Sequence, residues 1–391
     1  MARVSGIGDS AQHPSQLALV LSGGGARSAY QIGFLRSLAR HHPDLQIPIL
    51  TGVSAGAITA AFLASQPQNF QRKVEALTDR WRGITADQVF RVGTSSLASQ
   101  VLRVSLRLAS GGSLPAIEAR SLVDTTPLRA LLGSFLGTGG QLSAGIDENL
   151  RHGALKAVAI TASSYTTGQS TTWVQGREIP HWERAHRRSV PAQLTPEHVL
   201  ASTALPIFFP AVEVAGHWYG DGGIRLTSPL SPAVHLGADR IIAISTRFAR
   251  TRAEAEVPVA TGYPPPAQII GVLLSAILLD MFDADALGIE RVNRLIACVP
   301  PEQRDGLRPV KLLMLRPSRD LGELANDYEA DLPKTFRYLT RGLGTRETRS
   351  NGLLSMLMFQ TDYLKRLIDL GEQDAEARWS EVAAFMEGGS V

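Results

Sequence analysis

The chain has 391 residues, of which 44% are hydrophobic and 19% are charged, and its formal net charge at pH 7 is +3. This composition is typical of a globular protein and excludes a disordered chain, a collagen-like repeat and a coiled coil. The basic residues are scattered and are not interleaved with aromatic residues, so we expect no binding of nucleic acid. The single cysteine, Cys298, excludes an internal disulfide bond and a zinc site built from cysteines.

No targeting or membrane-spanning segment is expected from the sequence. Residues 1–16 are polar and lack the apolar core of a secretory signal peptide. The longest apolar stretch, residues 269–279, is shorter than the ~18 residues that a spanning helix needs. We therefore expect a cytoplasmic protein.

The first part of the chain alternates short apolar runs with turns and helices. Residues 17–21 and 47–50 are continuous apolar runs, which is the pattern of strands buried on both faces of a parallel sheet. Each run is followed by a glycine-containing turn and then by a helical pattern, at residues 32–39 and 57–64. This order of strand, turn and helix, repeated twice, predicts an α/β fold with a parallel sheet.

The middle of the chain adds further short elements. The sequence predicts strands at 157–162 and 241–245, a short helix at 196–204 and a hairpin at 212–219. Three consecutive prolines at 264–266 mark a break in this pattern.

After the prolines the chain is mainly helical. We expect one or two helices over 269–299, further helices at 353–370 and 375–386, and a strand at 310–315. The expected organisation is a flexible tail (1–15), an α/β domain (16–260) and a helical C-terminal region (261–391). We expect the C-terminal region to pack on the α/β domain and to add the strand near 310–315.

The most specific local motif surrounds Ser54. Residues 52–56 match G-x-S-x-G, with Gly52 and Gly56 on either side, and they lie between an apolar strand and a helix of small residues. This is the context of a nucleophile elbow, a sharp turn that forces the central serine outward. The alternative is a tight strand-to-helix turn in which Ser54 only caps the helix.

A glycine-rich turn, residues 23–27, follows the first strand. One interpretation is a dinucleotide fingerprint, but Ser28 occupies the third glycine position and Asp44 precedes the second strand instead of ending it. The other interpretation is an oxyanion hole, because parallel strand order places this turn beside Ser54. Arg27 would add positive charge there or would brace the loop.

A serine nucleophile needs a base, and Asp221 is the best candidate. It is flanked by Gly220, Gly222 and Gly223 at the end of the predicted hairpin, which leaves its carboxylate open to a cleft. An ionised aspartate there would take the proton of Ser54. The order Ser54, Asp221, His235 also fits a triad of the α/β-hydrolase kind, but that fold places several strands before its elbow.

Together these motifs resemble the patatin-like phospholipase family, in the order and approximate spacing of that family. The glycine-rich turn, the elbow at Ser54 and the Asp221 motif carry the resemblance. Supporting stretches lie at 124–128, 201–206 and 208–210, so that the resemblance covers residues 17–248. Ser28 is a departure, since the family commonly has glycine there.

The resemblance implies a three-layer fold with a mostly parallel central sheet flanked by helices. It also implies a Ser–Asp catalytic dyad, with Ser54 as nucleophile and Asp221 as base, and no cofactor or metal. The N–H groups of Gly24, Gly25 and Ala55 would hold the oxyanion. The full oxyanion-hole assignment is Gly23, Gly24, Gly25, Arg27 and Ala55. The helical C-terminal extension is similar to that of bacterial members.

The implied function is a serine lipid acyl hydrolase of phospholipase A or lysophospholipase type, which acts through an acyl-enzyme. Its partner would be a lipid or acyl-ester substrate, with transient contact at a membrane surface. Residues 97–109 and 269–279 are the candidate interfacial helices, and ordinary packed helices are the alternative. An acyltransferase or thioesterase with the same dyad, and a non-catalytic phosphate- or nucleotide-binding module, stay open as alternative functions.

Overall fold

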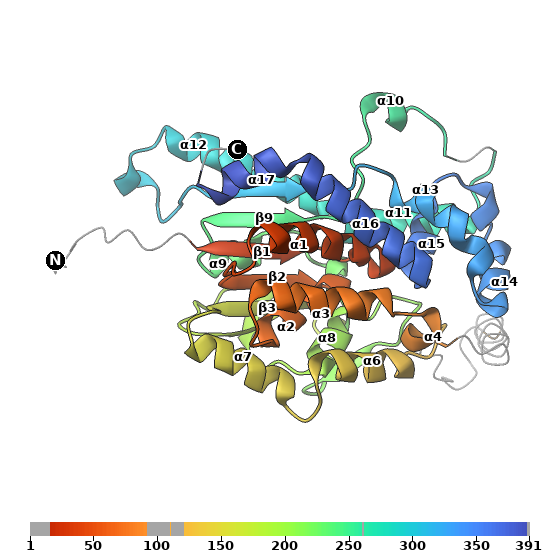
Figure 1. Cartoon of the computed structure of the whole chain (residues 1–391), viewed down its shortest axis with the longest axis horizontal. Helices are drawn as coiled ribbons and strands as arrows, with labels where there is room; N and C mark the ends of the chain where they lie inside the picture. The colour runs from red at the N-terminus through yellow and green to blue at the C-terminus, as the bar shows by residue number, and fades with distance from the viewer. Residues whose placement is uncertain (1–15, 92–109, 111–120, 260–261, 389–391) are drawn as a thin grey trace.

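The computed structural model describes residues 16–91, 110, 121–259 and 262–388 (Figure 1). The candidate interfacial helix at 97–109 lies outside these residues. The described residues form one sheet of ten strands in the order β10-β9-β1-β2-β3-β4-β6-β5, with the hairpin β7–β8 attached to β3. The part of the chain that the structure describes therefore has a single central sheet that is covered by helices.

The centre of the sheet is parallel. β10, β9, β1, β2 and β3 are parallel neighbours, while β4 and β8 pair antiparallel with β3. The parallel strands are β1 (Leu17–Leu21), β2 (Ile49–Val53), β3 (Ala157–Ser164), β9 (Arg240–Ile244) and β10 (Lys311–Leu315). The others are β4 (Ser170–Gly176), β5 (Glu183–Arg184), β6 (Arg187–Pro191), β7 (Val212–Val214) and β8 (His217–Asp221). The predicted α/β class with a mostly parallel sheet is confirmed.

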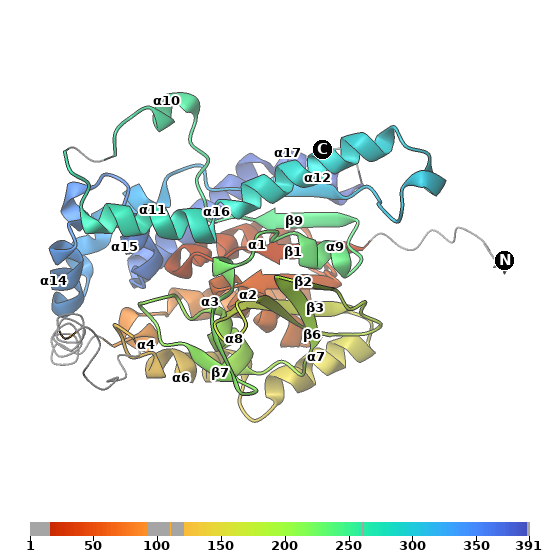
Figure 2. The same cartoon turned by 180° about the vertical axis from the view of Figure 1, so that it is seen from behind.

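Alternate residues of the central strands face two separate apolar cores. On one side, Leu19 and Leu21 of β1 pack with α1 (Ala29–His41), α2 (Ala55–Ser65) and α16 (Thr361–Ala377). On the other side, Ala18 and Val20 pack with α9 (Ser231–His235) and α12 (Met281–Ala297). Figure 1 shows the first helical layer and Figure 2 the second. Burial on both faces explains why these strands read as continuous apolar runs.

The remaining helices surround this framework. They are α3 (Phe70–Arg82), α4 (Ala86–Val89), α6 (Thr126–Leu136), α7 (Gln141–Arg151), α8 (Pro196–Ser202), α10 (Arg252–Ala255), α11 (Pro266–Leu278), α13 (Leu321–Ala325), α14 (Lys334–Gly342), α15 (Gly352–Leu357) and α17 (Trp379–Met386). Short 3-10 helices are η1 (Gly25–Ser28), η2 (Gly222–Ile224), η3 (Pro301–Gln303), η4 (Asn326–Asp331) and η5 (Thr345–Glu347).

The residues after 260 share the sheet and the core with the rest of the chain. β10 extends the sheet beside β9, and α16 lies along α1 (Figure 1). The two helices touch through glycines, because a Cβ on Gly33 would overlap the carbonyl oxygen of Ile368, and one on Gly371 would overlap that of Tyr30. Contact this close fixes α16 against the glycine-rich end of α1.

The helix expected at 353–370 is instead two helices, α15 and α16. The break falls at residues 358–360, where the Gln360 side chain accepts hydrogen bonds from the N–H groups of Asp362 and Tyr363 and begins α16. The helix expected at 375–386 is the end of α16 followed by α17. Glutamine is not among the preferred N-cap residues, so the pattern gave no sign of this break.

The apolar segment at 269–299 forms two helices, α11 and α12, joined by a turn at residues 279–280. Taken as one segment, Pro266–Ala297 is long and apolar enough to cross a membrane by length and composition, contrary to our expectation that no stretch is. Only 33% of its most apolar window is buried inside the protein. This partial burial matters below.

Candidate active site

The glycine-rich turn and the Ser54 turn lie side by side at one edge of the sheet. β1 and β2 are parallel neighbours in register, with Leu21 opposite Gly52, so their carboxyl ends meet at the same edge. A Cβ on Gly23 would lie 2.9 Å from the Cβ of Ser54. The structure therefore brings the two motifs into contact, at the position where parallel α/β sheets bind their ligands.

Ser54 occupies a strained turn between β2 and α2. Its backbone angles are φ 55° and ψ −131°, a region that costs a residue with a side chain free energy. The flanking glycines permit the turn, because a Cβ on Gly56 would overlap the carbonyl oxygen of Leu21, and one on Gly52 that of Gly56. This geometry is that of a nucleophile elbow.

Ser202 of α8 holds this turn in place. The Ser54 N–H donates to Ser202 Oγ over 2.9 Å, and Ser202 Oγ donates in turn to the Thr161 carbonyl over 2.6 Å. The hydroxyl thus ties the elbow to β3 and α8 at once. Sequence analysis gave Ser202 no role of its own, since nothing local to residue 202 indicates a partner 148 residues away.

Asp221 ends β8 and is completely buried. Its Oδ1 accepts a hydrogen bond from the Gly223 N–H over 2.9 Å, while its Oδ2 has no partner among the described residues. Burial raises the pKa of Asp221 to about 6, against the opposing effects of the Ser54 hydroxyl and the Gly223 N–H. Ser54 therefore lies close enough to influence the carboxyl group, although no hydrogen bond of good geometry joins them.

Gly222 is required for this arrangement. A Cβ at this position would overlap the carbonyl oxygen of Thr161 and press on Val53, the residue that precedes the nucleophile. The next residue, Gly223, faces the side chain of Leu278 from α11. The Asp221 motif is therefore packed between β3, the elbow and the C-terminal region.

The glycine-rich turn presents backbone donors. Gly24 and Gly25 have positive φ angles of 143° and 57°, and the Thr246 hydroxyl donates to the Gly23 carbonyl over 2.7 Å. The hydrogen bonds of the described residues leave the N–H groups of Gly24, Gly25 and Ala55 without an acceptor. All three residues line the same pocket as Ser54. Donors in this position suit a developing oxyanion.

Arg27 does not line that pocket. Its N–H donates to the Gly24 carbonyl over 3.1 Å, its Nε donates to Ser355 Oγ over 2.7 Å, and its Nη2 donates to the Gly352 carbonyl over 3.1 Å. The side chain is buried against α15, so the assignment of Arg27 to the oxyanion hole needs correction. Its contacts make it a brace between the glycine-rich turn and the C-terminal region.

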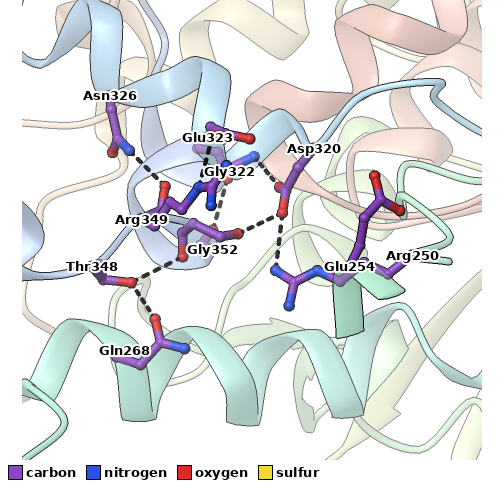
Figure 3. A network of polar contacts seen from close by, with 12 residues as sticks. Arg250, Glu254, Gln268, Asp320, Gly322, Glu323, Asn326, Thr348, Arg349 and Gly352 are labelled. Atoms are coloured by element: carbon purple, nitrogen blue, oxygen red, sulfur yellow. Dashed lines mark hydrogen bonds and ion pairs between the residues drawn. The ribbon is translucent and has the colours of Figure 1, made fainter. Parts of the chain in front are cut away.

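A polar network fixes α15 beside Arg27. Asp320 accepts hydrogen bonds from Ser350 Oγ over 2.8 Å and from Arg250 Nη2 over 3.1 Å, and the Thr348 hydroxyl donates to Gln268 of α11 (Figure 3). The chain leading into α15 is thus joined to α11, to the start of α13 and to the loop that precedes α10. The negative charge of Asp320 also acts on Arg27, whose pKa is lowered by burial.

An apolar pocket of about 680 Å³, including its opening to solvent, extends from Ser54. Among the described residues that line it, only Ser54 and Thr203 carry a polar side chain, and none is charged. One wall comes from residues before 260 and includes Trp81, Leu132 and Phe135. Its apolar lining suits a hydrocarbon chain.

The other wall of the pocket comes from the C-terminal region. Leu278 of α11 and Met356, Leu357 and Phe359 in and after α15 line it. The carbonyl oxygen of Met356 approaches Gly25 so closely that a Cβ there would overlap it. Sequence analysis missed this wall, because it assigned the C-terminal helices no part in the site.

His235 does not join Ser54 and Asp221. It lies in α9, on the opposite face of the sheet from α2, and its ring stacks on Trp182 at 4.8 Å. Among the described residues, no histidine is hydrogen-bonded to Ser54 or Asp221. The structure thus brings together the predicted dyad and not the alternative triad.

Comparison with known proteins gives the family. A family model described as patatin-like phospholipase matches residues 19–234, while a search of curated proteins found no match. Among solved structures, human GIVD cytosolic phospholipase A2 in complex with methyl gamma-linolenyl fluorophosphonate has a TM-score of 0.44 at 12% identity, covering 96% of this chain and 58% of that one.

Two bacterial structures are also similar. The type III effector ExoU of Pseudomonas aeruginosa has a TM-score of 0.38 at 13% identity, covering 94% of this chain and 53% of that one. VipD from Legionella pneumophila has a TM-score of 0.32 at 14% identity, covering 91% and 67%. The chain spans about three fifths of the length of the phospholipase A2 chains that it matches. By the family match, which covers more than half of its residues, the chain belongs to the patatin-like phospholipase family.

Proposed function

We propose that this protein is a serine lipid acyl hydrolase of phospholipase A or lysophospholipase type, with Ser54 as nucleophile and Asp221 as base. The observation that carries the proposal is the position of Ser54. It lies at one end of an uncharged apolar pocket, next to three backbone N–H donors and a buried carboxylate. Membership of a family of lipid-hydrolysing enzymes supports the same chemistry.

In the proposed reaction, an acyl chain enters the pocket and its ester carbonyl lies at Ser54. The Ser54 Oγ attacks the carbonyl carbon while the Asp221 carboxylate takes the hydroxyl proton. The N–H groups of Gly24, Gly25 and Ala55 hold the negative oxygen of the tetrahedral intermediate, and a donor of this kind is worth about 3–4 kcal/mol. The C–O bond to the leaving alcohol then breaks, and the alcohol takes the proton from Asp221.

The acyl-enzyme is then hydrolysed, with water as the nucleophile and Asp221 again as the base. A water molecule gives its proton to the Asp221 carboxylate and attacks the acyl carbon, and Ser54 recovers its proton as the fatty acid leaves. Asp221 must be ionised at the start of both half-reactions. Because burial raises its pKa to about 6, we expect kcat/KM to rise with pH through about 6 and then to level off.

The pocket gives no support to a phosphate- or nucleotide-binding module, because the described residues that line it include no cation. An acyltransferase or thioesterase would use the same dyad and differs only in the group that attacks the acyl-enzyme. We propose water as that group. The proposal includes a cytoplasmic location with peripheral contact at a membrane, where a lipid substrate is met.

The test compares hydrolysis of p-nitrophenyl butyrate and of a phospholipid by the wild type, Ser54→Ala, Asp221→Asn and His235→Ala. We expect Ser54→Ala and Asp221→Asn each to lose at least about 1,000-fold in kcat, and the double variant to lose little more, since the pair acts as a unit. His235→Ala should keep its activity. Loss of activity in His235→Ala would overturn the dyad, and unchanged activity in Ser54→Ala would overturn the nucleophile.

A further inference from the structure

The outer face of α11 is apolar over its whole length. Ile269, Val272, Leu273 and Ile277 have exposed fractions of 41%, 56%, 55% and 40%, and they recur at helical spacing. α11 contains no charged residue, and its remaining exposed positions are Pro266 and Ala276. A surface helix usually has a polar outer face. An apolar outer face of this kind marks an interaction site.

The inner face of the same helix forms part of the candidate active site. Leu278 lines the acyl pocket and its side chain meets Gly223, two residues after Asp221. Halfway along α11, Gly271 packs against Gly352 at the start of α15, the helix that holds Arg27. α11 therefore reaches the pocket through Leu278 at its C-terminal end and carries the exposed apolar face on its outer side, and Figure 2 shows the helix at the outside of the molecule.

The exposed face is small for a protein interface. At about 1.5 Å per residue and about 10 Å in width, 13 residues present roughly 200 Å², which is well below the roughly 800 Å² per partner of a stable complex. The neighbouring helix does not extend it as an apolar surface, because α12 exposes Glu290, Arg291 and Arg294 among its leucines. The area suits a helix lying in the surface of a bilayer.

The features of this segment suit a position on such a surface and not a span across it. Within the described residues, the turn at 279–280 interrupts Pro266–Ala297, and α12 carries Asp283 in ion pairs with Arg247 and Arg316. The side chains of Leu274 and Leu278 are buried in the protein interior. Ion pairs at this point of the chain are costly in hydrocarbon and are tolerated at a surface that faces water.

We propose that the outer face of α11 docks on the surface of a lipid bilayer and thereby places the acyl pocket next to the lipid that it takes. This inference rests on the proposed function for its substrate, but the docking itself is a separate property. Because the face is uncharged, its binding needs no anionic lipid and resists salt.

The test uses the full chain carrying Ser54→Ala, so that binding is measured without hydrolysis, and phosphatidylcholine vesicles in a sedimentation assay. Leu273→Glu places a charge on the outer face. Leu307→Glu is the matched control, because Leu307 has an exposed fraction of 54% in the loop after α12. Thermal melting of each variant reports whether it is folded.

We expect Leu273→Glu to weaken vesicle binding at least tenfold and Leu307→Glu to change it less than twofold, with binding retained at high salt. In the Ser54 background, Leu273→Glu should lower the ratio of vesicle hydrolysis to p-nitrophenyl butyrate hydrolysis at least tenfold. Equal binding of the two leucine variants would overturn the docking site. The docking site would also be overturned if the wild type is a dimer that does not bind vesicles and that Leu273→Glu dissociates into monomers. A second copy of the chain would then cover the face.

The two proposals fail in different ways. If vesicle binding follows the expected pattern while the wild type hydrolyses neither substrate, the docking site stands and the proposed function fails. If the wild type hydrolyses both substrates and Leu273→Glu changes neither vesicle binding nor the hydrolysis ratio, the function stands and the docking site fails.

Discussion

Two buried aspartates, one before and one after residue 260, have pKa values that are shifted in opposite directions. Asp221 lies at the edge of the sheet that carries the proposed active site, called the catalytic edge below. One of its oxygens has no partner among the described residues, and burial raises its pKa to about 6. Asp320, at the start of α13, is also largely buried, which by itself would raise its pKa. Hydrogen bonds from Ser350 and Arg250, the charge of Arg27 and the Gly322 N–H outweigh burial, so that its pKa is below the ordinary value.

The difference follows from what each region does. The catalytic edge combines an incompletely paired carboxylate with a strained serine turn, and both are unfavourable in a merely structural setting. The network around Asp320 is well paired and holds α15, which in turn binds Arg27 and lines the pocket at Ser54. The C-terminal region thus stabilises the structure next to a site that contains a strained turn and an incompletely paired carboxylate.

The sharpest test of this contrast is the pH dependence of stability in Asp221→Asn. A rise in pKa from 3.8 to about 6 on folding means that the free energy of unfolding of the wild type falls by about 3 kcal/mol as the pH rises through this window. The cost is complete above about pH 6. Asp221→Asn has no such cost, so it should be more stable than the wild type by up to about 3 kcal/mol at pH 8.

Urea denaturation at pH 8 and pH 4 measures this effect. At pH 4 the folded wild type has a protonated Asp221, so the advantage of the variant should largely disappear. An advantage of the same size at both pH values would show that charge burial is not its cause.

Asp320→Asn should lower the free energy of unfolding, which is the opposite of the effect expected for Asp221→Asn. The variant loses the charge-assisted hydrogen bonds from Ser350 and Arg250, at a cost of about 2 kcal/mol near pH 7. Because the folded-state pKa is lowered, this contribution of the carboxylate is present above its unfolded pKa and is lost as the pH falls through the folded value. Denaturation at pH 7 and at pH 3 should therefore show a deficit that shrinks on acidification, and a deficit that grows would contradict it.

Much of the fold was predictable, because the central strands are buried on both faces. Short apolar runs mark β1, β2, β3 and β9 in the sequence, although the run at 47–50 predicted the second strand earlier than β2, which is Ile49–Val53. The turns that follow β1 and β2 contain glycines that the close backbone contacts require. Ser54 and Asp221 could be proposed from the sequence for a different reason. Each lies in a short motif whose meaning is local.

The rest of the site depends on contacts that no local pattern encodes. Arg27 and Ser355 are 328 residues apart, and Leu278, Met356 and Phe359, which line the pocket, come from α11, from α15 and from the segment after α15. Arg27 was therefore assigned to the oxyanion hole by its motif, whereas its partners lie on α15. Apolar periodicity shows that a helix has a buried face but does not show what that face lies against.

Ser355→Ala tests whether the C-terminal region acts on the catalytic edge through Arg27. The variant leaves Arg27 Nε without its acceptor, and loss of one hydrogen bond to a charged group, about 1.5 kcal/mol, corresponds to about tenfold in rate. If Ser355 is a positioning residue, kcat for p-nitrophenyl butyrate should fall by this amount while KM stays nearly constant. Ser134→Ala, at an exposed serine of α6, is the control. A fall in thermal stability with unchanged kcat would make the role of Ser355 structural only.

The smallest expected effect concerns the strain at Ser54. With φ 55° and ψ −131°, the serine costs about 1–3 kcal/mol that glycine would not, and glycine loses about 0.5–1 kcal/mol through its greater freedom in the unfolded chain. Ser54→Gly should therefore raise the free energy of unfolding by about 1 kcal/mol relative to Ser54→Ala, although neither variant has a nucleophile. Equal stability of the two inactive variants would show that the turn is relaxed. The catalytic edge would then differ from the C-terminal region only in the pairing of its carboxylate.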